Sequence, residues 1–317
     1  MKKYFVFLCL VVSTTISATA ATTRDTSFTE SKVSLPTKAG NISGVLSLPA
    51  AGAGKVPVAL IIAGSGPTDR DGNSAMTKNN SLKMLSDALI KQGIATLRYD
   101  KRGVGESMGA GGSETTLRFD DYVDDAKGWV ALLKADKRFS RVVVIGHSEG
   151  SLIGMIAAAN ADQFVSIAGV GRPANQLLLE QIGAQSKQAG DAAAPILDSL
   201  KNGFTVKHVN IMLLSLFRPS IQPYMISWFK YDPQVEIAKL RIPVLLIQGT
   251  NDIQIPVEDA RRLAAASPKS TLVLIEKMNH LLKLVEGDRA ANMKTYNEPD
   301  LPIVPELPVR IGSFVLR

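Results

Sequence analysis

Val142-Val143-Val144-Ile145-Gly146-His147-Ser148-Glu149-Gly150 is the most informative stretch of this sequence. Its four consecutive β-branched residues favour a strand buried on both faces, and the Ala-, Met- and Ile-rich run after Gly150 favours a tightly packed helix. Between them lies the pattern G-x-S-x-G, whose glycines allow a reversal sharp enough to raise the Ser148 hydroxyl above the sheet. The start of the helix points its positive end at the same place. We therefore predict that Ser148 is a nucleophile; the alternative is an ordinary Gly-rich turn.

Strand and helix patterns alternate on the N-terminal side of this stretch. They predict a hairpin formed by Lys32–Leu35 and Ile42–Leu48, and buried strands at Val58–Ile62 and Ile94–Tyr99. They also predict a helix through Leu82 to Ile90 and a helix from Phe119 to Lys134. Continuously apolar strands that alternate with helices indicate a mostly parallel sheet with right-handed crossovers.

The alternation stops after the strand expected at Phe164–Ala168. Residues 172–239 contain helical patterns, five prolines and six aromatic residues but no buried strand, which predicts an inserted helical cap. An insertion at this place emerges at the carboxyl edge of the sheet, where ligands bind in open α/β folds. Its aromatic and Leu/Met side chains are expected to shape a pocket or to pack the cap onto the core.

The core pattern resumes after residue 239. We expect a strand at Val244–Ile247, a helix from Pro256 to Ala266, a strand at Thr271–Ile275, a polar loop from Gly287 to Pro305 and a terminal helix carrying Leu307, Ile311 and Phe314. Residues 30–171 and 240–317 are thus predicted to form one core, interrupted by the cap at 172–239.

The N-terminus has the pattern of a secretory signal peptide. Basic residues at positions 2 and 3, an apolar run from Tyr4 to Val12 and Ala18-Thr19-Ala20 predict cleavage after Ala20. The apolar run is too short to span a membrane. The only cysteine, Cys9, falls within this segment, which leaves the mature chain without a thiol, as suits an oxidising compartment. We expect a periplasmic or secreted protein.

The charge of the chain argues against nucleic acid as a partner. The formal net charge is +7, or +5 once Lys2 and Lys3 are removed, and no Lys/Arg block or basic helix gathers it. Dispersed charge of this kind solvates a surface but does not grip phosphates.

A serine nucleophile needs an imidazole to take its proton and a carboxylate to orient that imidazole. The chain has three histidines. His147 is expected to point away from the Ser148 hydroxyl and His208 lies in the inserted segment, which leaves His280 as the base. Asp252 follows the strand at Val244–Ile247 and is the predicted carboxylate; the order Ser, Asp, His is the one this architecture uses. Taken singly, Asp252 could be a turn residue and His280 a surface histidine.

Acyl transfer also needs donors for an oxyanion. The N–H of Glu149 is the first predicted donor. The second is expected from the Gly-rich loop after Val58–Ile62, at the N–H of Ser65, with Gly66 as the alternative. In that loop Asp69-Arg70-Asp71-Gly72-Asn73 echoes a calcium-binding loop, but the glutamate ligand and flanking helices are missing. We predict neither a metal nor a cofactor.

These residues together resemble the α/β-hydrolase superfamily. The resemblance rests on Gly146 to Gly150, on Tyr99-Asp100-Lys101-Arg102-Gly103-Val104-Gly105-Glu106-Ser107, and on Gly249 to Asp252 with Asn279-His280. More narrowly, Ala63 to Asn73 and Tyr296 to Phe314 resemble the bacterial carboxylesterases of the EstD type, grouped with serine-aminopeptidase-like hydrolases. Ala63 departs from the His-Gly pair common in the superfamily, which leaves the oxyanion residue less defined than the nucleophile.

This resemblance implies an eight-stranded sheet with one antiparallel strand and a helical cap, and hydrolysis of small esters with short to medium acyl chains. The residues themselves indicate acyl transfer from a serine. Thioesterase, peptidase or acyltransferase activity on the same triad remains an alternative, as does a binding protein of this fold without turnover. The sequence does not define an oligomeric state.

Overall fold

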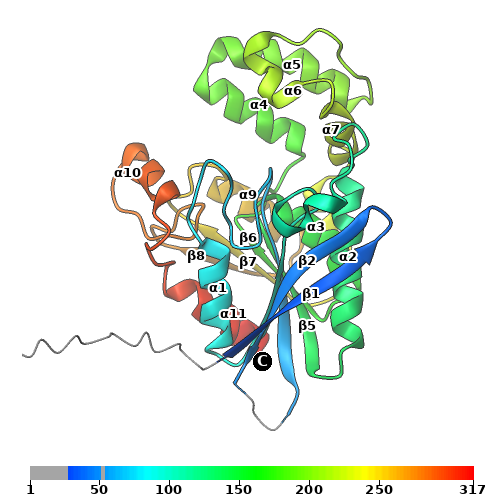
Figure 1. Ribbon diagram of the computed structural model, residues 1–317. Helices are drawn as coiled ribbons and strands as arrows, with labels where there is room; N and C mark the ends of the chain where they lie inside the picture. The colour runs from blue at the N-terminus through cyan, green and yellow to red at the C-terminus, as the bar shows by residue number, and fades with distance from the viewer. Residues whose placement is uncertain (1–27, 51–53) are drawn as a thin grey trace, which may run out of the picture.

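The computed structural model describes residues 28–50 and 54–317. The predicted signal peptide, with Cys9, lies outside the described residues. Within them, eight strands form one sheet in the order β1-β2-β4-β3-β5-β6-β7-β8 (Figure 1). The strands are β1 Phe28–Thr37, β2 Gly40–Pro49, β3 Val56–Ile62, β4 Ala95–Tyr99, β5 Phe139–His147, β6 Gln163–Ile167, β7 Val244–Gly249 and β8 Thr271–Ile275.

A single strand runs against the others. β2 is antiparallel to both of its neighbours, β1 and β4, whereas the pairs from β4 through β8 are parallel. β1 and β2 form the predicted hairpin, with Thr37 opposite Gly40. The expected eight-stranded, mostly parallel sheet with one antiparallel strand is confirmed.

Helices cover both faces of the sheet. One face packs against α2 (Phe119–Ala135), α3 (Glu149–Ala157) and α9 (Val257–Ala266), and the other against α1 (Ser81–Ile90) and α11 (Glu306–Val315). Short 3₁₀ helices, η1 (Gly105–Ala110) and η2 (Ala158–Asn160), follow β4 and α3.

The central strand β5 explains why its sequence is apolar throughout. Val142 and Val144 enter the core that contains Trp129 of α2, whereas Val143 and Ile145 enter the core on the opposite face. Successive side chains of a strand point to opposite faces, so a strand covered on both sides needs apolar residues at every position. Full burial of such a side chain contributes about 1.5–3 kcal/mol, which holds the end of β5 firmly at the centre of the molecule.

The segment 172–239 lies between β6 and β7 in the chain and contains only helices. They are α4 Ala174–Gln185, α5 Lys187–Lys201, η3 Ile211–Leu213, α6 Leu214–Phe217, α7 Gln222–Trp228 and α8 Pro233–Ala238. In Figure 1, α4, α5 and α6 lie together at the top of the view, beyond the end of the sheet at which α3 begins.

Aromatic contacts fasten this segment to helix α2. The Phe119 ring stacks on Trp228 with a centroid distance of 6.1 Å and packs 5.3 Å from Tyr231. The Phe119 N–H donates to Ser227 Oγ at 2.8 Å. Phe217 and Phe229 are fully buried. These side chains therefore pack the segment onto the core, and Phe217 and Phe229 do not face an open pocket.

The stretch 287–305 differs from the polar loop that the sequence predicted. It contains α10 (Arg289–Lys294) and η4 (Thr295–Asn297). Asp288 caps α10, its side chain accepting the Ala291 N–H at 2.9 Å. The side that α10 buries carries Asn292, which hydrogen-bonds to other polar groups. A helix without an apolar stripe has no periodic signal, so the pattern missed it.

No helix in residues 28–50 or 54–317 combines the length and the apolar character needed to cross a bilayer.

Candidate active site

The turn between β5 and α3 forces Ser148 into a strained backbone conformation. Its φ is 55° and its ψ −122°. The two flanking glycines allow this turn, because a Cβ on Gly146 would overlap the Gly150 carbonyl and a Cβ on Gly150 would overlap the carbonyl of Ile62. A non-glycine residue at such a conformation costs about 1–3 kcal/mol, a strain that clusters at functional sites.

The Ser148 hydroxyl is not used in the structure of the turn. An ordinary serine before a helix has extended backbone angles, and its oxygen accepts an N–H of the first turn. Ser148 has neither feature, and its hydroxyl has no hydrogen-bond partner among the described residues. The side chain is partly exposed. Its oxygen is therefore free to react, which distinguishes this turn from an ordinary Gly-rich one.

Asp252 and His280 are hydrogen-bonded to each other. His280 Nδ1 lies 2.8 Å from Asp252 Oδ2, and both side chains are buried. A carboxylate oxygen only accepts, so Nδ1 carries the proton and Nε2 is left as the basic nitrogen. The His280 ring lies 4.8 Å, centroid to centroid, from the ring of His147, the residue next to Ser148. No hydrogen bond joins Ser148 to His280; such contacts often tighten only when substrate binds.

The Asp252 carboxylate is fully satisfied. Oδ1 accepts the N–H groups of Gln254 and Ile255 at 2.8 and 2.9 Å, and Oδ2 accepts Gln248 Nε2 at 3.0 Å in addition to His280. Burial alone would raise the pKa of Asp252, but the electrostatic interaction with His280 and the hydrogen bonds from His280, Ile255 and Gln254 hold that pKa below its usual value. Asp252 therefore stays ionised beside the imidazole.

The two other histidines are placed differently. His147 is buried, and its Nε2–H donates to the backbone carbonyl of His280 at 2.8 Å. Burial, and then the neighbouring His280, lower the pKa of His147 to about 3, so this ring is neutral at ordinary pH. His208 is exposed in the segment 172–239.

The turn that carries His280 is shaped by Asn279, which the sequence analysis quoted without a role. Asn279 Oδ1 accepts the N–H groups of Leu281 and Lys283 at 3.0 and 2.9 Å. Its Nδ2 donates to Thr295 Oγ1 at 2.8 Å and to Asn292 Oδ1 at 3.2 Å. The stretch expected to be a loop thus supports the histidine turn. In the sequence, the only indication of this role was that Asn279 is adjacent to the candidate base His280.

The loop after β3 lies against Ser148. A Cβ built on Gly64 would be 3.1 Å from the Cβ of Ser148. Ser65 and Gly66 follow and are exposed. Among the described residues, the N–H groups of Glu149 and Ser65 donate to no backbone acceptor. Free donors on both sides of a nucleophile are what an oxyanion site requires.

The stretch Asp69 to Asn73 is closed by the protein's own hydrogen bonds. Asp69 Oδ1 accepts the N–H groups of Asp71 and Asn73 at 2.9 and 2.8 Å, and the Asp71 carboxylate pairs with Arg98. These carboxylates are engaged as turn and ion-pair partners. Over residues 28–50 and 54–317, no group of three or more His, Cys, Asp or Glu side chains is arranged to hold a metal.

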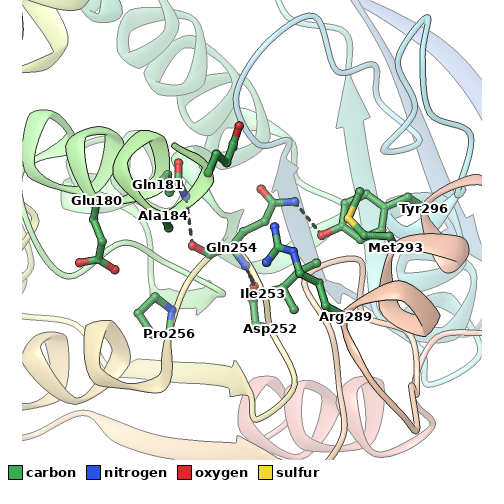
Figure 2. A pocket seen from close by; sticks show the side chains of 11 residues that line it. Glu180, Gln181, Ala184, Asp252, Ile253, Gln254, Pro256, Arg289, Met293 and Tyr296 are labelled. Carbon is green, nitrogen blue, oxygen red and sulfur yellow. Dashed lines mark hydrogen bonds between the residues drawn. The ribbon is translucent and has the colours of Figure 1, made fainter. Parts of the chain in front are cut away.

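A pocket of about 620 Å³ opens beside Asp252, between α4 and the α10 region (Figure 2). Figure 2 shows Gln254 at its centre, with its carbonyl accepting from Gln181 of α4 at 3.0 Å and its Nε2 donating to the Tyr296 hydroxyl at 2.9 Å. The lining includes neither Ser148 nor His280. The pocket therefore adjoins Asp252 and does not contain Ser148.

Comparisons with known proteins find relatives of this chain among hydrolases. A family model described as serine aminopeptidase, S33, matches residues 78–227, which include Ser148 but end before Asp252 and His280. The esterase EstD of Thermotoga maritima is 29% identical over 262 residues, covering 78% of this chain; the chain spans 59% of the length of EstD.

Solved structures share the fold at low identity. Est1E of Butyrivibrio proteoclasticus, in a structure with ferulic acid bound, superposes with a TM-score of 0.60 at 16% identity, covering 90% of this chain and 99% of Est1E. An esterase of Pyrococcus furiosus gives a TM-score of 0.58 at 18% identity, covering 92% of both chains. The eight-stranded, mostly parallel sheet and these structural neighbours show that the chain has the α/β-hydrolase fold.

Proposed function

We propose that this protein is a serine carboxylesterase that hydrolyses small esters with short to medium acyl chains. The observation that carries the proposal is the hydrogen bond between His280 Nδ1 and Asp252 Oδ2, 2.8 Å long, in a molecule whose Ser148 hydroxyl is free at a strained turn. A serine, an oriented imidazole and a buried carboxylate are the groups that nucleophilic acyl transfer needs.

The proposed reaction has two halves. Ser148 Oγ attacks the ester carbonyl carbon while His280 Nε2 takes the hydroxyl proton, and the oxyanion accepts the N–H groups of Glu149 and Ser65. The carbon–oxygen bond to the alcohol then breaks, and His280 returns the proton to the leaving alcohol. Water, deprotonated by His280, attacks the acyl-enzyme in the same way and releases the acid. Asp252 keeps the imidazole in the required tautomer throughout.

The segment 172–239 is proposed to cap this site. Its helices lie beyond the end of the sheet at which α3 begins (Figure 1), and Tyr224 of α7 reaches the residue after the nucleophile. It also exposes large apolar side chains, among them Phe204, Ile211 and Met212. Apolar surface near a reaction centre suits an acyl chain.

A peptidase is the second candidate, because the matching family model is described as a serine aminopeptidase. The names of EstD, Est1E and the Pyrococcus protein favour an ester. We also propose export after cleavage at Ala20, supported by the N-terminal pattern; a mature N-terminus at Ala21, read by mass spectrometry, is the expected result.

The test compares Ser148→Ala with Ser151→Ala. Ser151 is buried in α3 and bonded to Ser166 Oγ at 2.7 Å. Loss of the nucleophile should lower kcat on p-nitrophenyl butyrate by about 10⁶-fold, whereas Ser151→Ala should retain it. A fluorophosphonate should label the Ser148 peptide alone. Labelling of another serine, or faster release from an aminoacyl anilide than from the ester, would contradict the proposal.

A further inference from the structure

Lys101 is a fully buried lysine next to the candidate site. It follows β4 and has a side chain only 1% exposed. Its Nζ donates to the Gly64 carbonyl at 2.5 Å, lies 4.0 Å from Glu149 Oε1 and sits 5.1 Å above the centre of the Tyr122 ring. Lysine is almost never fully buried without partners, because desolvating its charge is costly. We therefore expect these contacts to have a functional role that offsets the free-energy cost of burying the ammonium group.

The Gly64 carbonyl belongs to the same peptide group as the Ser65 N–H. A trans peptide is planar, so its C=O and N–H point in opposite directions, and no cis peptide occurs among the described residues. Anchoring Gly64 O on Lys101 therefore aims the Ser65 N–H away from Lys101. A hydrogen bond from a cation also polarises the peptide and strengthens its N–H as a donor.

The partner of Lys101, Glu149, supplies the other predicted oxyanion N–H. Its carboxylate is buried and accepts the Tyr224 hydroxyl at 3.0 Å. Tyr224 lies on α7, so this bond crosses from the segment 172–239 to the residue that follows the nucleophile. Burial raises the pKa of Glu149 and lowers that of Lys101, while their mutual attraction opposes both changes.

We propose that Lys101, Glu149 and Tyr224 form one set of positioning residues. This set fixes the orientation of the two predicted oxyanion donors, the N–H groups of Ser65 and Glu149, and couples them to helix α7. Lys101 orients the Ser65 peptide, Glu149 ties that lysine to the start of α3, and Tyr224 ties Glu149 to the segment 172–239. This inference rests on the proposed function.

The principal variants are Lys101→Met, which keeps the length of the side chain but removes the donor, and Tyr224→Phe, which removes one hydroxyl. Deleting an entire oxyanion donor costs about 10²–10³-fold in kcat. A donor that is present but poorly aimed should cost less, so we expect Lys101→Met to lower kcat by about 10–100-fold. Tyr224→Phe should lower kcat about fivefold, the worth of one hydrogen bond. KM should stay within about twofold in both, because the oxyanion exists only after attack.

A second readout separates positioning from a general loss of structure. When Ser148 Oγ adds to the carbonyl carbon of a trifluoromethyl ketone, the Ser148 hydroxyl proton goes to His280 and the carbonyl oxygen becomes an oxyanion in the same place. Its affinity should fall by the same factor as kcat in each variant, while the affinity for the product acid is unchanged. If Lys101→Met does not fold, Tyr224→Phe and Glu149→Gln, which retains an acceptor for Tyr224, carry the test.

Tyr231→Phe is the matched control. Tyr231 also donates its hydroxyl to a carboxylate, the half-buried Asp120, with its Oδ1 at 2.5 Å, but that carboxylate is on α2 and not on the turn that carries Ser148. Its kcat should equal that of the wild type. Equal losses in Tyr231→Phe and Tyr224→Phe, or unchanged kcat and ketone affinity in folded Lys101→Met, would overturn the inference. Failure of Ser148→Ala to abolish turnover would overturn the proposed function instead.

Discussion

Replacing the buried His147 with glutamine tests how this imidazole limits stability in acid. His147 donates from Nε2 to the carbonyl of His280, and the Nε2 of glutamine offers a similar donor. The substitution therefore preserves the hydrogen bond and removes the titrating group. The readout is the dependence of the free energy of unfolding on pH.

The magnitude follows from the pKa of His147, lowered by burial and by His280 from 6.5 to about 3. Between these pH values His147 is protonated in the unfolded chain but not in the folded chain, so the free energy of unfolding falls as the pH decreases through this range. Each pH unit costs about 1.4 kcal/mol. His147 should thus remove about 2 kcal/mol of stability between pH 6.5 and pH 5.

Urea unfolding at pH 7.5 and 5.0 measures this difference in the wild type, His147→Gln and His208→Gln. His208 is exposed, so its replacement is the matched control. The wild type and His208→Gln should each lose about 2 kcal/mol more than His147→Gln on going to pH 5.0. Asp and Glu residues contribute equally in the three proteins. An identical loss in all three would refute the assignment of a neutral, buried His147.

Two further predictions concern the acid and the helical segment. Asp252→Asn should lower kcat for ester hydrolysis by about 10⁴-fold, because it leaves His280 in the wrong tautomer. Glu276→Gln, which changes an exposed carboxylate nearby, is the control and should leave kcat unchanged. Full activity of Asp252→Asn would contradict the role proposed for Asp252. Phe217→Ala should cost about 3–5 kcal/mol of stability because the ring is fully buried, whereas Phe204→Ala, 69% exposed, should cost no more than about 0.5 kcal/mol. Thermal unfolding measures both, and equal effects would contradict the observed packing.

Several features of the molecule could be predicted from the sequence because they depend on residues that are close together in the chain. The run Val142 to Ile145, the glycines around Ser148 and the apolar strands each carry a local pattern, and the structure has these strands close to the expected bounds. Asp252 and His280 could be selected because they follow successive strands whose carboxyl ends meet at one edge of a sheet. In the structure the two side chains are hydrogen-bonded.

Other features had no local signal. The residue that helix α10 buries is the polar Asn292, so the helix lacks an apolar period, and its place was predicted to be a loop. The aromatic residues of the segment 172–239 suited either a pocket or a packed interface, and only their burial assigned Phe217 and Phe229 to the interface.

The polar contacts around Ser148 depend on the tertiary structure alone. Lys101 and Gly64 are 37 residues apart in the chain, Glu149 and Tyr224 are 75 apart, and His147 and His280 are 133 apart. The sequence by itself specified the sheet, the strained turn and the order of the three candidate catalytic residues, because strand periodicity and turn chemistry are local. Whether a lysine, a glutamate or a histidine is buried, and with which partner, depends on groups that only folding brings together, and the cost of desolvating an unpaired charge makes each such pairing a property of the whole fold.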